Sequence, residues 1–294
     1  MHKRALSIRE RQLSTDHPHV AQSLNNIAML YQSQGRYGEA EPLYHRALLI
    51  QEQQLGANHP DVASSLNNLA ELYRAQGRYS EAEPLYERAI YIWEQHLETD
   101  YIDVATGLNN LALLYQSQGR YTEAAPLYQR LLSIREQERL DSNHPNTAII
   151  FNNLESFYRT QEQYVKAARN YHDVALQYQE KRQYSQAESL YQQSLTVREQ
   201  WLGSDHLDVA LSLNSLAVLY HSQERYAEAE PLYIRAVTIL VSQLGANHPN
   251  TQTCKQNFLN LLNQAFTAGQ AAQLSDHPLT QAVLQQIRTG NSNA

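Results

Sequence analysis

A stretch of about 40 residues recurs along the chain, and this repeat constrains the fold more than any other feature. Copies beginning at residues 17, 59 and 101 follow one another at a period of 42 residues, and a further copy runs from His206 to Gly245. A unit this short cannot bury its apolar side alone, so consecutive copies must stack on one another. The sequence therefore predicts one elongated array, in place of the two globular domains that 294 residues would otherwise suggest.

Each copy is predicted to form two helices joined by a tight turn. Apolar residues recur at spacings of three and four between positions 62 and 73, which gives a helix one apolar stripe. Gly77 permits the positive φ that ends such a helix. The second helix is predicted to begin at Ser80, because Glu83 three residues later completes a capping-box pattern.

The distribution of small and large residues resembles the tetratricopeptide repeat. Alanines at 70 and 82 and large residues at 66, 69, 73 and 86 occupy that family's consensus slots. The 42-residue length and the sequences LNNLA and EAEPLYxRAL resemble more specifically the kinesin light chain type. The resemblance covers residues 1 to 266 and implies an all-α, right-handed α-solenoid of helix-turn-helix repeats. Such a scaffold serves many partners, so it says less about function.

Tyrosine marks the units, since the chain has 20 tyrosines against 4 phenylalanines and 2 tryptophans. Eighteen of them fall into six triads with spacings of six and seven residues. The triads begin at Tyr31, Tyr73, Tyr115, Tyr158, Tyr178 and Tyr220. We expect these rings to fill the space between stacked helices, with each hydroxyl reaching a polar partner at the edge.

The triads also reveal an irregular unit with a deleted helix. Tyr171 and Tyr178 are 7 residues apart, whereas the other successive triads are separated by 29 or 30, so about 22 residues are missing. The segment 165–180 is predicted to serve both as the second helix of one unit and as the first helix of the next. We expect the superhelix to kink, split or repack around residues 160–185, with a simple restacking of helices as the alternative. Glu155, in a slot that holds alanine elsewhere, indicates more open packing there.

These features divide the chain into five parts. We predict a half repeat at 1–13 with the second helix only, a regular array at 14–163 and a shortened, irregular repeat at 164–201. A repeat with a C-terminal capping helix follows at 202–266, and a terminal helix with a polar tail at 267–294. The half repeat carries no polar cap, so the chain is a fragment of a longer protein or its end pairs with another chain.

Composition and motifs argue against several functional classes. A net charge of -7 disfavours nucleic acid and anionic membranes, and no apolar stretch approaches the roughly 18 residues of a membrane span. The single cysteine, Cys254, excludes an internal disulfide, and with no apolar leader at the start we expect a cytoplasmic protein. No catalytic or phosphate-binding motif occurs, so we expect no enzyme and no cofactor. The recurring His-Pro histidines lie on separate loops, and we expect no metal site.

The resemblance implies that first helices line a concave groove. It places these candidate peptide-binding residues there: Asn25, Asn67, Glu71, Arg74, Asn109, Gln116, Asn152, Arg159, Asn214 and His221. An amide both donates and accepts, so the recurring asparagines could bind the backbone of an extended peptide. They could equally bond neighbouring helices and fix the spacing of the units. Kinesin light chains recognise acidic peptides, but the mapped groove has only Arg74 and Arg159 as full positive charges, so that preference is not transferred.

The predicted function is therefore non-catalytic binding of a protein or peptide partner in the groove. One alternative is a structural module that self-associates through the uncapped N-terminal end. Another is the sensory arm of a larger signalling protein. Light scattering at two concentrations separates the first alternative from a monomeric scaffold.

Overall fold

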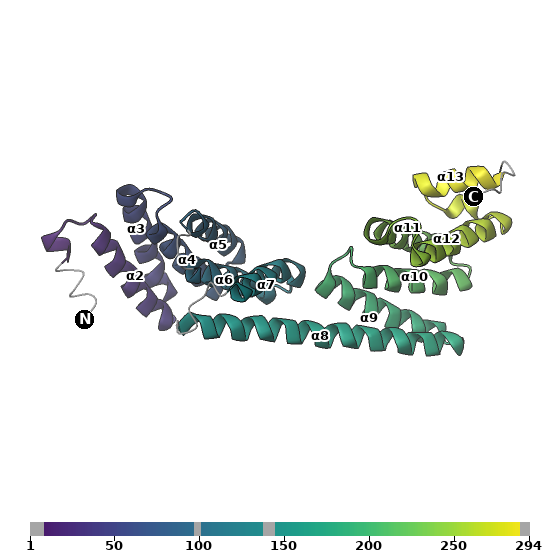
Figure 1. Ribbon diagram of the computed structural model, residues 1–294, viewed down its shortest axis with the longest axis horizontal. Helices are drawn as coiled ribbons and strands as arrows, with labels where there is room; N and C mark the ends of the chain where they lie inside the picture. Colours follow the sequence, from purple (N-terminus) through teal and green to yellow (C-terminus); the bar gives the residue numbers. More distant parts are fainter. Residues whose placement is uncertain (1–8, 97–100, 138–144, 289–294) are drawn as a thin grey trace. The chain divides into compact units, whose positions relative to one another are not determined.

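The computed structural model describes residues 9–96, 101–137 and 145–288, and their regular secondary structure is entirely helical (Figure 1). The helices are α2 (Pro18–Ser33), α3 (Tyr37–Leu55), α4 (Pro60–Ala75), α5 (Tyr79–Glu94), α6 (Ile102–Ser117), α7 (Tyr121–Glu136), α8 (Pro145–Glu180), α9 (Tyr184–Leu202), α10 (Leu207–Ser222), α11 (Tyr226–Leu244), α12 (Pro249–Thr267), the short 3-10 helix η1 (Ala271–Gln273) and α13 (Pro278–Arg288). The expected all-α solenoid of helix pairs is confirmed. None of these helices is both long and apolar enough to cross a membrane.

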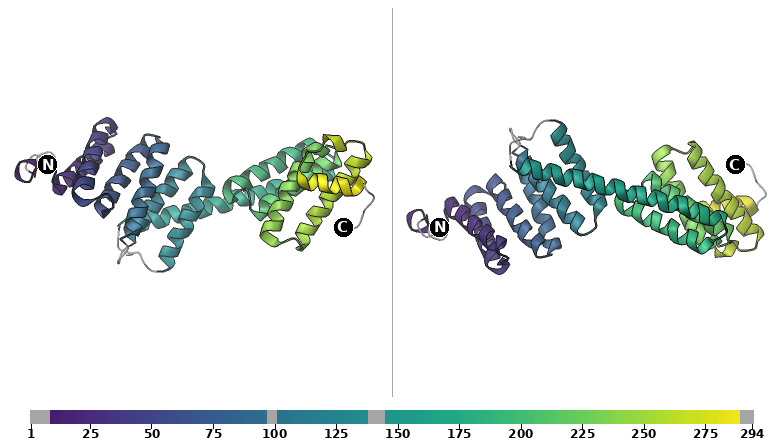
Figure 2. Two further views of the ribbon diagram at one scale, coloured as in Figure 1. Left: turned by 90° about the horizontal axis from the view of Figure 1, so that it is seen from above. Right: turned by 90° about the horizontal axis from the view of Figure 1, so that it is seen from below.

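Neighbouring helices pack as antiparallel pairs, α2 with α3, α4 with α5, α6 with α7 and α10 with α11 (Figure 2). The turn within a pair is set by a residue of positive φ, such as Gly77 at 74°. Beyond it, the backbone N–H of Arg78 bonds the carbonyl of Tyr73 at 2.9 Å, which satisfies a carbonyl that the helix end leaves free.

The predicted capping box at Ser80 is wrong. Helix α5 begins at Tyr79, and its N-cap, Arg78, makes no side-chain cap bond. Glu83 does not turn back to the start of its own helix, because Arg120 of the following unit binds its carboxylate at 2.7 Å. The caps lie instead at the first helices, where the histidine before the helix accepts a hydrogen bond on Nδ1 from the N–H two residues later. These caps are His17, His59, His206 and His248.

The tyrosine triads form much of the core, as predicted. The third tyrosine is fully buried in five of the six triads, at Tyr44, Tyr86, Tyr128, Tyr191 and Tyr233. The ring of Tyr128 also stacks on Phe157 of α8 at 4.6 Å between centroids. The second tyrosine opens the second helix of a pair, except Tyr164 inside α8, and it is only half-buried in units such as that of Tyr79.

The array divides at residue 157 into two compact units, Met1–Phe157 and Tyr158–Ala294. The division lies just before the range 160–185 in which the sequence predicts an irregularity. In the first unit, the start of α8 acts as a first helix, since Asn153 donates to Asn109 of α6 at 2.9 Å. In the second unit, its C-terminal half pairs with α9, where Ser194 Oγ donates to the carbonyl of Ala168 at 2.8 Å.

The segment 165–180 therefore serves as the first helix of a pair, but not as a separate second helix of the preceding unit. Helix α8 runs without a turn for 36 residues. Its residue at the turn position is Glu162, where three of the regular units have a glycine of positive φ. Glu155 is exposed, because no second helix folds back over its slot, and this avoids the cost of burying its carboxylate.

Exchanging the turn-slot glutamates for glycine is expected to have opposite effects in the two places. Glu162 lies inside a helix, so Glu162→Gly should lower the free energy of unfolding by about 1 kcal/mol. Glu224 occupies the same slot at a φ of 61°, where glycine is unstrained, so Glu224→Gly should be neutral or stabilising by up to about 1 kcal/mol. Urea unfolding followed by circular dichroism measures both, and equal effects would contradict the continuous α8.

The C-terminal end of the array is covered by α13, which agrees with the predicted terminal helix. Leu284 of α13 and Leu274 before it are buried in the core of the second unit. The predicted polar tail at 289–294 and most of the predicted half repeat, residues 1–8, lie outside the described residues. From residue 9 the chain is in contact with α2, where Arg9 donates to Ser23 Oγ at 2.7 Å.

Candidate functional site

The candidate asparagines of the first helices are less accessible than a groove ladder suggests. Asn25, Asn67 and Asn109 are buried, with exposed fractions of 8%, 8% and 4%. Asn152 is exposed and Asn214 is half-buried. Three of the five candidate asparagines are therefore largely covered by neighbouring helices.

These asparagines form rungs between consecutive first helices. Asn110 donates to Asn67 Oδ1 at 3.1 Å, Asn153 to Asn109 Oδ1 at 2.9 Å and Asn257 to Asn214 Oδ1 at 3.3 Å. The donor is in each case the second residue of the Asn-Asn or equivalent pair in the following unit. The interhelical role of the asparagines is thus observed, and their role in binding a peptide stays a prediction.

The rung between α2 and α4 differs from the other three. Asn25 Nδ2 donates to Ser65 Oγ at 2.6 Å, and Ser65 in turn donates to Gln51 Oε1. Asn25 Oδ1 is buried and has no hydrogen-bond partner among the described residues. A buried acceptor without a partner is uncommon, so this atom marks a place where a ligand could bind.

Glu71 and Arg74 form an ion pair on α4. The guanidinium donates to the carboxylate through Nε at 2.8 Å and Nη2 at 3.0 Å, and the Tyr86 hydroxyl donates to the same carboxylate at 2.5 Å. The hydrogen bond to Glu71 raises the pKa of Arg74, and burial raises the pKa of Tyr86. The charge of Arg74 is therefore balanced within the protein, and the expectation that acidic peptides are not favoured stays a prediction.

The remaining candidates are distributed over both units. Gln116 accepts a hydrogen bond from Tyr128 at 3.1 Å, and His221 Nε2 lies 3.0 Å from Gln264 Oε1. Arg159 is exposed on α8. The first unit holds Asn25, Asn67, Glu71, Arg74, Asn109, Gln116 and Asn152, and the second holds Arg159, Asn214 and His221.

Two hollows open at the same position of the repeat. The first, between α2 and α4, has a volume of about 360 Å³ and is lined by Pro18, His19, Gln22, Asn25, Asn26, Met29, Gln51, Asp61, Ser64 and Asn68. The second, between α10 and α12, has a volume of about 280 Å³ and is lined by Leu207, Asp208, Ala210, Leu211, Asn214, Leu240, Leu244, Asn250, Thr253 and Cys254. The first is therefore rich in amides and the second in aliphatic side chains.

At four junctions between successive units, the space beside the first helices is filled by two residues 14 positions apart, one on a second helix and the other on the following first helix. Gln51 accepts from Ser65 beside the first hollow, and Leu240 and Cys254 both line the second. Between α4 and α6 the corresponding pair is Trp93 and Gly107, and a Cβ on Gly107 would lie 2.9 Å from Cζ3 of the Trp93 indole. Arg198, bonded to Ser212 Oγ at 2.7 Å, fills the junction between α9 and α10.

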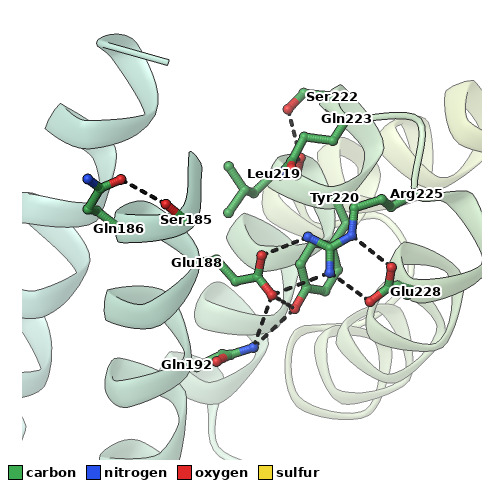
Figure 3. A network of polar contacts seen from close by, with 10 residues as sticks. All are labelled: Ser185, Gln186, Glu188, Gln192, Leu219, Tyr220, Ser222, Gln223, Arg225 and Glu228. Atoms are coloured by element: carbon green, nitrogen blue, oxygen red, sulfur yellow. Dashed lines mark hydrogen bonds and ion pairs between the residues drawn. The ribbon is translucent and has the colours of Figure 1, made fainter. Parts of the chain in front are cut away.

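A clamp that sequence reasoning missed joins successive units (Figure 3). Arg225 lies over the ring of Tyr220 at 4.0 Å and binds Glu228 of its own helix. It also reaches back to Glu188 of α9 at 2.7 Å, whose other oxygen accepts from the Tyr220 hydroxyl at 2.9 Å. The Arg225 hydrogen bond lowers the pKa of Glu188 below its ordinary value.

The same clamp recurs where both partners are present. Arg78 binds Glu41, and Arg120 binds Glu83, each over a separation of 37 residues. In the irregular region both partners change together, since Ala125 and Ala168 replace the glutamate and Gln163 and Gln183 replace the arginine. A constant spacing of 37 residues between Glu and Arg was the sequence signal that would have found it.

Among the described residues no three His, Cys, Asp or Glu side chains are placed to hold a metal ion. Cys254 is buried, and burial raises the pKa of its thiol to about 12, so the thiolate needed for nucleophilic attack does not form near neutral pH.

The sequence model described as tetratricopeptide repeat matches residues 1–44, 19–95, 103–172 and 166–240, which is most of the chain. The chain belongs to the tetratricopeptide repeat family. Members of this family are typically protein-protein interaction scaffolds and generally not catalysts. This tetratricopeptide repeat protein is accordingly built from the helix pairs that the 42-residue period predicted.

Individual proteins are similar to parts or most of this tetratricopeptide repeat protein. A 42-residue segment, 14% of the chain, is 50% identical to Nephrocystin-3 of Xenopus laevis but spans only 3% of that protein. A putative kinesin light chain of Podosopora anserina is 26% identical, over 78% of this chain and 98% of that one, with a TM-score of 0.40. The TPR2AB domain of yeast Sti1, solved as a complex with pHSP90, is 14% identical, over 83% of this chain and 99% of that one, with a TM-score of 0.38.

Proposed function

We propose that the first unit binds an extended segment of a partner protein across α2, α4 and α6. The observation that carries this proposal is the hollow between α2 and α4, which combines an unpartnered buried amide oxygen with the exposed side chain of Met29. Buried donors and acceptors are normally paired, so a ligand that supplies the missing partner gains a hydrogen bond and buries the methionine.

The surface around this hollow supports a peptide rather than a highly charged ligand. Arg74 and Glu71 neutralise each other, and the Gln116 amide is already bonded to Tyr128. What α2 leaves accessible is a short row of uncharged groups, Gln22, Asn26 and Met29. Amide and thioether groups suit the backbone and uncharged side chains of an extended segment. The expected compartment for this binding is the cytoplasm.

A display library of linear peptides, selected against the full chain, tests the proposal. We expect selected peptides to bind Met29→Glu at least about tenfold more weakly, because the variant replaces an apolar contact with a second carboxylate in a hollow that Asp61 already lines. Leu49→Glu on α3 is the matched control, since Leu49 is 54% exposed and Met29 is 50% exposed. Peptides that bind both variants as tightly as the unaltered chain would contradict the proposed site.

A further inference from the structure

The hollow between α2 and α4 contains an open rung. Asn25 and Asn68 stand where Asn67 and Asn110 stand one unit later, and the later pair is joined at 3.1 Å. At the first junction no such bond forms. Asn25 Oδ1 is left without a partner although only 8% of the residue is exposed, and Asn68 lies beside the hollow.

Ser65 explains why this rung is open. Its single hydroxyl proton goes to Gln51 Oε1, so its oxygen must accept from the amide of Asn25, at 2.6 Å. The nitrogen of Asn25 therefore faces Ser65, and its oxygen faces away. One unit later the serine is replaced by Gly107, which offers no acceptor, and Asn67 closes its rung with Asn110.

The open rung leaves one acceptor, buried in the wall of the hollow, and one donor on a residue that lines the same hollow. Asn25 Oδ1 is the acceptor, and Asn68 has the amide that donates at the equivalent rungs. A carboxamide supplies the complement, because its NH₂ donates and its carbonyl accepts. At about 360 Å³ the hollow has room for such a side chain with water beside it.

We propose that this hollow is a subsite for the glutamine or asparagine side chain of the bound segment, whose carboxamide replaces the missing Asn–Asn bond. The proposal rests on the proposed function, the binding of a partner segment across α2, α4 and α6. A carboxylate of the same shape is rejected, because it cannot donate to Asn25 and because Asp61 lines the hollow with a like charge.

Methionine methyl NMR on the full chain tests the subsite directly. The chain has two methionines, so Met29 in the hollow and Met1 as an internal reference give two methyl signals. The probes are the peptides acetyl-Ala-Ala-X-Ala-Ala-dimethylamide, with X as glutamine, glutamate or norleucine, so that the glutamine side chain is the single primary carboxamide in the set. We expect the glutamine peptide to shift the Met29 signal saturably and to bind at least about tenfold more tightly than the other two, since an unmatched buried polar group weakens binding strongly.

Two variants connect this preference to the open rung. Ser65→Ala frees Asn25 to bond Asn68, and Asn68→Asp removes the donor while keeping the shape, so each should abolish the preference for glutamine. Ser33→Ala is the control, because Ser33 is exposed and its hydroxyl donates to the carbonyl of Leu30 in its own helix. Helical circular dichroism of each variant verifies the fold, and Asn68→Asp, on a half-exposed side chain, tests the idea if Ser65→Ala unfolds.

The outcomes separate this inference from the proposed function. Equal binding of the glutamine and norleucine peptides, or unchanged glutamine preference in Asn68→Asp, would overturn the carboxamide subsite. If library-selected peptides still lose affinity for Met29→Glu in that case, the groove function stands without the subsite. If selected peptides bind but leave the Met29 signal unchanged, both the subsite and the proposed groove are wrong.

Discussion

Gly107→Val is expected to lower the free energy of unfolding by about 2–3 kcal/mol, although it replaces a glycine inside a helix with a residue that favours helix more. A Cβ at this position would lie 2.7 Å from Ile90 Cγ1 and 2.9 Å from Trp93 Cζ3. Both neighbours are buried, at 7% and 6% exposure, so neither can move aside into solvent. Urea unfolding followed by circular dichroism measures the loss.

A double variant tests whether Trp93 is the cause. Trp93→Leu alone should destabilise by about 2–3 kcal/mol, because it leaves a cavity beside Gly107. Combining Trp93→Leu with Gly107→Cys reproduces the pair Leu240 and Cys254 found between α11 and α12. The double variant should then be at least about 1 kcal/mol more stable than the sum of the single effects. Additive losses would show that the two positions do not share one space.

Much of the fold could be predicted because the same pattern of apolar residues and tyrosines recurs in successive units. The tyrosine spacing located the missing helix, and the glycine slot located each turn. The same spacing could not show whether α8 turns at residue 162. The residue in this slot does not decide the outcome, because glutamate continues the helix at position 162 and adopts a φ of 61° at the turn residue 224. The packing of a second helix against the first decides it.

The candidate site was harder to predict, because position on a helix does not determine which partner a polar side chain takes. The asparagine slot was correctly placed on the first helices, but whether its amide meets a peptide or the next helix depends on residues 40 or more positions away. Ser65 captures Asn25, whereas Gly107 leaves Asn67 to Asn110. Only packing brings these residues together.

A buried carboxylate at the C-terminal end gives a second large effect. Glu230 is 1% exposed and occupies the slot from which Glu188 reaches Arg225. The residue in the arginine slot of the next unit is Thr267, and the carboxylate instead accepts from Ser275 N at 2.7 Å, Ser275 Oγ at 2.6 Å and Thr280 Oγ1 at 2.5 Å. The segment that contains α13 thus supplies the donors that a further repeat would otherwise supply.

Removing these donors should detach α13. Ser275→Ala with Thr280→Val leaves a buried carboxylate with one remaining donor, and we expect a loss of about 3 kcal/mol in the free energy of unfolding, with faster amide hydrogen exchange over residues 278–288. Adding Glu230→Gln removes the charge and should recover at least about 1 kcal/mol, since the desolvation cost disappears with it. The control is Ser242→Ala on α11, because the Ser242 hydroxyl donates to the Ile239 carbonyl of its own helix. If Glu230→Gln deepens the loss instead, the hydrogen bonds and not the buried charge hold the C-terminal segment in place.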